Sequence, residues 1–183
     1  VIVEHSYVDL GGRFTATQIG IHDDALIPGL RKLANVIHDS GSLAAIQINH
    51  SGGKCLQAIC GSQPVGPSSI KYWREPTRGL KISEIRSLIQ KFGDATRRAV
   101  EAGFDAVEIH AAHGWLLNEF ASRLTNKRAD QYGGSLENRF RLPMEVIRDV
   151  RKRVGEEYPV FFRLGADDFT LGGLTIEESK TMA

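Results

Sequence analysis

Two histidines stand three residues apart where an apolar run gives way to polar residues, in the order His110-Ala111-Ala112-His113. One interpretation is a pair of half-buried, satisfied imidazoles, because histidine is intermediate in burial. A second is a metal site, although no third ligand stands at a recognisable spacing. A third is a pair of N–H donors that converge on one carbonyl oxygen. Such donors stabilise the negative charge that develops there during hydride addition to a conjugated double bond.

The two cysteines, Cys55 and Cys60, are separated by four residues. Without a second pair of ligands, this spacing is weak evidence for a metal site. We interpret both residues as reduced thiols in a loop and expect no metal. The opening residues Val1-Ile2-Val3-Glu4 carry no leader pattern, so we expect a cytoplasmic location.

Four short apolar runs are typical of β-strands, and the third ends just before the histidine pair. They cover residues 1–4, 43–48, 106–109 and 160–164. Between them, apolar side chains recur with the 3.6-residue period of amphipathic helices. Capping residues predict where these helices begin: Asp23 or Asp24, Ser83, Ser135, and a capping box made by Thr175 and Glu178. Turn residues predict that the first two helices end at Ser40-Gly41 and at Gly103.

The connections between the strand-like runs are far too long for hairpins, so they predict a parallel sheet. The runs are nearly continuous in apolar residues, which is typical of strands covered on both faces. Dinucleotide-binding and P-loop motifs are absent. Polar, glycine-rich stretches follow the strands, the longest at about residues 51–82, as active-site loops do in a (β/α)₈ barrel.

The expected fold is therefore α/β: a partial (β/α)₈ TIM barrel with about four parallel strands and three to four helices. Residues 1–183 would form a fragment of a single domain. A doubly wound sheet of four strands is the alternative, but both ends of the chain would then cut through an element.

Composition excludes several classes of partner. The chain carries 23 Lys+Arg against 22 Asp+Glu, a formal charge of +1, so its charge does not favour nucleic acid or a membrane surface. Its apolar runs are too short to cross a bilayer.

The segment after the histidine pair resembles the old yellow enzyme family. The family pattern is His-x-x-His/Asn-Gly-Tyr-Leu, then Asn-x-Arg-x-Asp-x-Tyr-Gly-Gly-Ser-x-Glu-Asn-Arg. This chain matches it through residues 110–122 and 126–139. Further matches extend the resemblance to the whole chain, as family strands two to five: Glu4-His5-Ser6-Tyr7-Val8, residues 47–54, Pro67-Ser68-Ser69 and residues 162–169.

The resemblance implies an FMN-dependent oxidoreductase that reduces the C=C bond of α,β-unsaturated carbonyl compounds with NADH or NADPH. It implies that His110 and His113 hydrogen-bond the carbonyl of a small enone or enoate. Gln47 would bind the pyrimidine edge of the flavin, and Arg163 would lie near N1 and the C2 oxygen. His5 and Ser6 would line the flavin ring mostly through backbone.

Each cofactor residue also has a simpler interpretation when it is taken alone. Gln47 would be a buried amide that satisfies backbone groups, and Arg163 would form an ion pair with a carboxylate inside the barrel. The block from Tyr132 to Arg139 is interpreted as structural, because Gly133-Gly134 supplies a turn and Ser135 can cap a helix.

Three residues depart from the family pattern. Trp115 stands where many relatives carry the tyrosine that protonates the substrate, and an indole cannot supply that proton near neutral pH. Lys54 replaces the usual arginine, and Arg123 the usual proline. Water or another side chain would then supply the proton.

Two other functions are possible interpretations of the same sequence. A non-catalytic, isolated half-barrel is the main alternative, and a homo-oligomer is one possible assembly. A dihydroorotate-type dehydrogenase is disfavoured by the histidine pair and the Tyr-Gly-Gly-Ser block.

Overall fold

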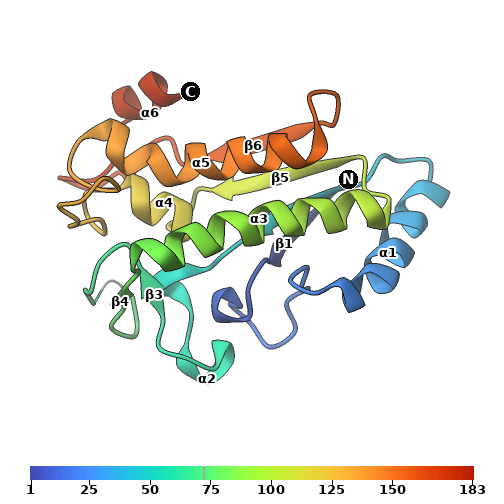
Figure 1. Cartoon of the computed structure of the whole chain (residues 1–183), viewed down its shortest axis with the longest axis horizontal. Coiled ribbons are helices and arrows are strands. Elements are labelled where there is room, and N and C mark those ends of the chain that lie inside the picture. Colours follow the sequence, from blue (N-terminus) through green and yellow to red (C-terminus); the bar gives the residue numbers. More distant parts are fainter. Residues whose placement is uncertain (72) are drawn as a thin grey trace.

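The computed structural model describes residues 1–71 and 73–183, and within them one sheet carries four strands (Figure 1). The strands lie in the order β1 (Ile2–Tyr7), β2 (Ala45–Asn49), β5 (Ala106–Ala111) and β6 (Val160–Leu164). Each neighbouring pair is parallel. The predicted parallel sheet is confirmed, and His110 lies inside the third strand rather than after it.

Three long helices connect successive strands: α1 (Ile27–Asp39), α3 (Ile82–Ala102) and α5 (Leu136–Val154). They lie together against one face of the sheet, with α3 between the other two (Figure 1). A shorter helix, α6 (Ile176–Met182), follows β6. This regular alternation gives four βα units, half the number in a (β/α)₈ barrel.

The two faces of the sheet differ in chemistry. Side chains alternate along a strand, and one set packs against the helices. That set is fully buried in β2 and β5, where it includes Ile46, Ile48, Val107 and Ile109. The other set is more polar and includes Gln47, Asn49, Glu108, His110 and Arg163, although Phe161 also belongs to it. The nearly continuous apolar runs therefore describe the helix-covered face of the sheet better than the second face.

Most of the predicted helix caps are confirmed. The Asp23 carboxylate accepts a hydrogen bond from the Ala25 N–H at the short 3₁₀ turn η2 (Asp24–Leu26) that leads into α1. Ser135 and Thr175 cap α5 and α6, and Gly103 ends α3 with a φ of 89°.

The prediction that Ser83 caps the second helix is wrong. Helix α3 begins at Ile82, and its N-cap residue is Lys81. The Glu84 carboxylate accepts the Lys81 N–H at 2.7 Å and pairs with Arg78 at 2.7 Å. A carboxylate in the first turn therefore satisfies the helix start, and Ser83 lies within that turn.

The long loop after β2 contains short ordered pieces that the sequence pattern did not indicate. They are η3 (Gly52–Lys54), α2 (Gln57–Cys60) and the two-residue parallel strands β3 (Val65–Gly66) and β4 (Arg78–Gly79). Before α1 lies a further 3₁₀ turn, η1 (Leu10–Gly12).

A helix also interrupts the segment after β5 that was expected to be a polar loop. This helix, α4 (Leu116–Ala121), is buried at every residue. Among the described helices, none is long and apolar enough to cross a membrane.

Candidate functional site

A pocket of about 370 Å³ lies on the polar face of the sheet. Five of the six residues predicted to form the site line it together, and they come from all four strands or the segment just after β5. The lining consists of Ile2, Glu4, His5, Gln47, His110, His113, Trp115 and Arg163. The structure thus brings together predicted site residues that are far apart in the sequence: His5 and Arg163 are separated by 158 positions.

The two histidines of the pair are hydrogen-bonded to each other. The Ala112 N–H donates to His110 Nδ1 at 3.2 Å, so a neutral His110 carries its proton on Nε2. His110 Nε2 lies 3.2 Å from His113 Nδ1, which then accepts that proton's hydrogen bond. It follows that the remaining N–H group of His113 is at Nε2. Both rings are therefore donors at Nε2.

The environment keeps both imidazoles neutral. Burial, followed by the neighbouring His113, lowers the pKa of His110 to about 3. Partial burial and the charges of Arg163 and Lys54 lower the pKa of His113 as well. At neutral pH the pair consequently offers N–H donors without carrying positive charge.

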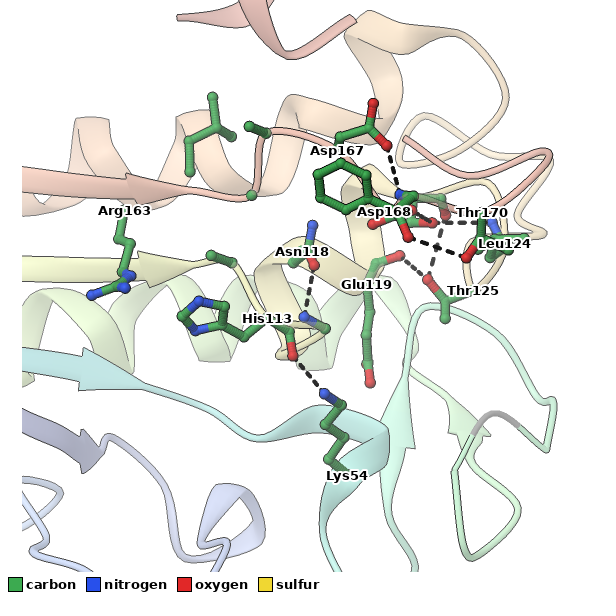
Figure 2. Close-up of a pocket in the computed structure, with 17 residues that line it drawn as sticks. Lys54, His113, Asn118, Glu119, Leu124, Thr125, Arg163, Asp167, Asp168 and Thr170 are labelled. Carbon is green, nitrogen blue, oxygen red and sulfur yellow. Dashed lines mark hydrogen bonds between the residues drawn. The ribbon is translucent and has the colours of Figure 1, made fainter. Parts of the chain in front are cut away.

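The backbone around His113 is bent to hold its ring in place. His113 has a φ of 58°, in the left-handed region that non-glycine residues rarely adopt, and Gly114 follows with a φ of 67°. The Asn118 amide oxygen accepts the Gly114 N–H at 2.7 Å. The Lys54 ammonium donates to the His113 carbonyl oxygen at 2.5 Å (Figure 2). Strained backbone held from two sides is typical of functional sites.

His5 reaches the pocket through its side chain, whereas the resemblance implied mostly backbone. The pairing of β1 with β2 is irregular between Val3 and Ser6, and such bulges re-aim side chains. The Nδ1 atom of His5 lies 2.9 Å from the Gln18 amide nitrogen and 3.1 Å from that of Asn49. Since both amides donate, His5 also presents an N–H at Nε2.

Ser6, the sixth predicted residue, does not join this group. It pairs with Ile48, which belongs to the core on the helix-covered face, and its hydroxyl is fully buried. Ser6 is not one of the described residues that line the pocket. Any contact from Ser6 to a flavin would therefore come from its backbone.

Gln47 and Arg163 differ from their simpler interpretations. The Gln47 amide nitrogen donates to the Glu108 carboxylate, a side-chain partner rather than a backbone group. Arg163 is exposed beside His110 in the sheet register, and no ion pair joins it to a carboxylate within residues 1–71 and 73–183. Glu108 was missed from the sequence, although it shares the period-two face of His110.

A second, larger pocket of about 600 Å³ adjoins the first at the carboxyl ends of β5 and β6 (Figure 2). His113 and Arg163 line both pockets. Other residues with ionisable side chains around it are Lys54, Glu119, Asp167 and Asp168. In Figure 2, Arg163 projects from β6 toward the side on which the His113 ring lies.

Glu119 is a buried carboxyl group that the sequence pattern did not single out. Its Oε1 atom accepts the Gly53 N–H at 2.8 Å. Its Oε2 atom is buried with no hydrogen-bond partner among the described residues. Burial raises the pKa of Glu119 well above its ordinary value, so the group is held in its neutral form.

Trp115 is buried between the histidines and a lysine. Its ring lies 5.1 Å from the His5 ring and 4.9 Å from that of Phe14, measured between centroids. The Lys54 ammonium lies 5.0 Å from the centre of the same indole. Thus two of the three departures from the family pattern contact each other at the site.

Arg123, the third departure from the family pattern, and the block from Tyr132 to Arg139 make structural contacts. Arg139 is buried and shares the Glu178 carboxylate with Arg123, at 2.7 Å from each guanidinium. The Tyr132 hydroxyl donates to Glu145 at 2.9 Å. These contacts join α5 to α6 and to the loop before α5, through side chains that line neither of the two pockets.

Both cysteines are buried thiols. Cys55 donates to the Gly11 carbonyl and Cys60 to that of Ser62, each at 3.2 Å. Burial raises the pKa of the Cys55 thiol. Within the described part of the chain, no three His, Cys, Asp or Glu residues are grouped as metal ligands.

Comparisons with known proteins identify the family of this chain. The model of the NADH:flavin oxidoreductase / NADH oxidase family matches residues 1–183. An NADH oxidase of Thermoanaerobacter brockii is 43% identical over 187 residues, which cover 100% of this chain and 29% of that protein. The chain belongs to the NADH:flavin oxidoreductase / NADH oxidase family.

Solved structures of the same type superpose closely on it. A 2-naphthoyl-CoA reductase in complex with 2-naphthoyl-CoA matches with a TM-score of 0.94 and 35% identity, over 99% of this chain and 30% of that one. The old yellow enzyme homologue from Zymomonas mobilis matches with a TM-score of 0.89 and 32% identity, over 100% of this chain and 55% of that one. The fold is therefore part of a TIM barrel of the old yellow enzyme type, and the chain spans well under two thirds of these relatives.

Proposed function

We propose that this chain forms part of an FMN-dependent oxidoreductase that reduces the C=C bond of α,β-unsaturated carbonyl compounds with NADH or NADPH. The observation that carries the proposal is the neutral donor pair of His110 and His113, placed in one pocket with Gln47 and Arg163. Family membership supports a flavin and a nicotinamide reductant.

The polar face of the sheet has the donor and acceptor set that a flavin requires. Gln47 and Glu108 offer amide and carboxylate groups of the kind that pair with the edge of a pyrimidine ring. Asn49 has a buried Oδ1 atom with no hydrogen-bond partner among the described residues, an acceptor that a ligand N–H would satisfy. The residues present therefore fit FMN, and they would hold its ring.

When bound, FMN supplies the hydride. Arg163 would place its positive charge against the ring, since it has no carboxylate partner in the described residues. His110 and His113 would bind the substrate carbonyl. An incoming oxygen would replace His113 Nδ1 as the acceptor of the His110 Nε2–H and would accept the His113 Nε2–H as well. Two donors then stabilise the charge that develops on that oxygen.

We further propose that residues 1–183 correspond to strands two to five of one FMN-binding barrel. In barrels of this kind the phosphate is commonly held by the loops after strands seven and eight. The four βα units described above would then supply the ring-binding and substrate-binding half of the site, while the phosphate would be bound by the other half.

The proposal is tested with the protein that contains the complete barrel. The purified protein should show the visible absorbance of oxidised flavin and lose it when NADH or NADPH is added without oxygen. Addition of 2-cyclohexenone should then restore that absorbance, with cyclohexanone as product. A flavin that is reduced by the nucleotide but is not reoxidised by any enone, enoate or nitroalkene would refute ene-reduction and leave only the flavin oxidoreductase class.

A further inference from the structure

The reduction of a double bond needs a proton as well as a hydride, and the indole at position 115 cannot supply it. We propose that the ammonium group of Lys54 donates this proton to the α-carbon of the substrate. The inference rests on the proposed ene-reduction and names the acid of that same site.

Position is the first argument. Lys54 lines the larger pocket together with His113 and Arg163, which also line the smaller pocket. Its ammonium contacts the His113 carbonyl oxygen at 2.5 Å and lies 5.0 Å from the Trp115 ring. Because the α-carbon is bonded directly to the carbonyl carbon, an oxygen held by the histidines places the α-carbon within their immediate surroundings. The long, flexible lysine stem lets its ammonium reach a neighbouring position.

The chemical state of Lys54 also suits an acid. Partial burial lowers its pKa, while the nearby Glu119 carboxyl opposes this change. The other charged or titratable groups near it are His110 and His113 on the β5 side, and Arg74, which lies against the same Trp73 ring as Lys54. An ammonium whose pKa is moved toward neutrality is a better general acid than an exposed lysine.

The step balances in atoms and electrons. Once the hydride has reached the β-carbon, the electron pair of the former double bond lies on the α-carbon and the carbonyl oxygen. One N–H bond of Lys54 breaks as the α-carbon–hydrogen bond forms, and a neutral amine remains. Lys54 is only partly buried, so this amine regains a proton from water.

Glu119 is the competing acid, because its carboxyl is neutral and it lines the same pocket. Its orientation argues against it. Oε1 is bound to the Gly53 N–H, and Oε2 is so close to Gly52 that a Cβ on that glycine would lie 2.5 Å from it. The carboxyl therefore packs against the backbone of η3.

The decisive experiment uses a nitroalkene such as 1-nitrocyclohexene with the complete, flavin-loaded protein. Hydride addition to a nitroalkene leaves a nitronate, which is stable enough to be detected by its near-ultraviolet absorbance if no acid protonates its carbon. The wild-type protein should release the nitroalkane. Lys54→Met and Lys54→Arg should still reoxidise the flavin but form the nitroalkane about 10²-fold more slowly and release nitronate.

Lys54→Arg keeps the positive charge and a donor for the His113 carbonyl, so it separates acid catalysis from support of the loop. Lys127→Met is the matched control. Its ammonium also donates to a backbone carbonyl, that of Arg123 at 2.6 Å, and it should behave as wild type. The proposal would be overturned if Lys54→Arg formed nitroalkane at the wild-type rate. It would also be overturned if Glu119→Gln released nitronate while the Lys54 variants did not.

A readout independent of turnover is the titration of Lys54 itself. In ¹³C-methylated protein, the Lys54 resonance, assigned by its loss in Lys54→Arg, should titrate at a lower pH than exposed lysines. The wild-type product should shift from nitroalkane to nitronate across that same pH range. If the ratio of nitroalkane to nitronate did not change over the pH range in which Lys54 titrates, the proposal would be contradicted. This test needs only the wild-type product, so it holds even if Lys54→Met and Lys54→Arg fail to fold. If the wild-type protein reduces no activated alkene, the proposed function itself fails and this inference falls with it.

Discussion

The rings of the histidine pair are positioned mainly through backbone groups, so the donor role proposed for them does not depend on the residues proposed to bind the cofactor. The Ala112 N–H fixes the tautomer of His110, and the bent backbone at His113 sets the direction of its ring. A side chain positioned in this way can be removed without disturbing Gln47 or Arg163 on the neighbouring strands.

We therefore expect His110→Ala combined with His113→Ala to retain nearly all bound flavin in the complete barrel protein. Enone reduction should fall by about 10²–10³, the usual cost of losing a donor at such a site. The measurement is the rate of flavin reoxidation by 2-cyclohexenone after reduction by NADH. His38→Ala serves as control, since His38 pairs with Asp105 outside both pockets. A double variant with wild-type turnover would show that the donor assignment is wrong.

Arg163 gives a prediction about redox potential. A cation beside the flavin N1 favours the anionic reduced form, so Arg163→Met should lower the reduction potential of the bound flavin. Arg163→Lys keeps the charge and should lower the potential less. A spectroelectrochemical titration measures both. The alternative, a structural ion pair, predicts lost stability with an unshifted potential.

At the scale of elements, the sequence was sufficient for the pieces whose pattern is local. The four strands, three long helices and most caps follow from apolar runs, the 3.6-residue period and side chains such as Asp23 and Ser135. Helix α4 was missed because its six residues make fewer than two turns, which is too short a stretch to show a helical period. Ser83 was assigned as a cap because serine is a common one, but the Glu84 carboxylate satisfies that helix start instead.

The site was predicted from a resemblance more than from patterns. The roles expected of His110, His113, Gln47 and Arg163 follow from the family motif, and the structure brings these residues together with His5. Glu119 was missed because burial of a carboxyl cannot be predicted from one strand or helix pattern. Its environment depends on Gly53, 66 positions earlier in the chain.

Helix α4 holds the Glu119 carboxyl in a buried position beside Gly53. Because burial raises the pKa of this carboxyl, the stability of the folded protein should depend on pH in a defined direction. A carboxyl whose folded pKa is raised contributes stability below its unfolded pKa and loses it as pH rises through the folded pKa. As pH rises, Glu119 loses its proton in the unfolded chain at a lower pH than in the folded protein. The free energy of unfolding therefore decreases above about pH 4.3, the pKa of an unperturbed glutamate. Glu119→Gln resembles the neutral acid in shape and removes the penalty.

We expect Glu119→Gln to be more stable than wild type at pH 8, with the difference shrinking toward pH 4. Urea unfolding of the two proteins at several pH values measures it. Glu137→Gln is the control, because Glu137 is an exposed residue in the first turn of α5. A stability difference that does not change with pH would mean that Glu119 is ionised in the folded protein.

At the scale of the whole molecule, the sheet has two outer strands. In the described residues, β2 is the only strand that pairs with β1, whose last residue Tyr7 also bridges to Gly20, and β6 pairs only with β5. Most of β1 and all of β6 therefore lie at an edge of the sheet. Apolar side chains lie at both edges: Ile2 is 51% exposed and Phe161 is 50% exposed. Unpaired edges of this kind invite pairing with another chain.

The isolated 183-residue chain should therefore bind FMN poorly, show no reductase activity and associate with itself. The chain contains Gln47 and Arg163, which are proposed to bind the flavin ring, but in barrels of this kind the phosphate is commonly held by loops after later strands. Sedimentation measures the self-association, and calorimetric titration measures the binding of FMN. A charged residue on an exposed edge opposes pairing, so Phe161→Lys should reduce association. Leu171→Lys should not, because Leu171 is 99% exposed in a loop beyond the sheet. Micromolar or tighter FMN binding by a monomer would instead show that these 183 residues form a self-sufficient flavin domain.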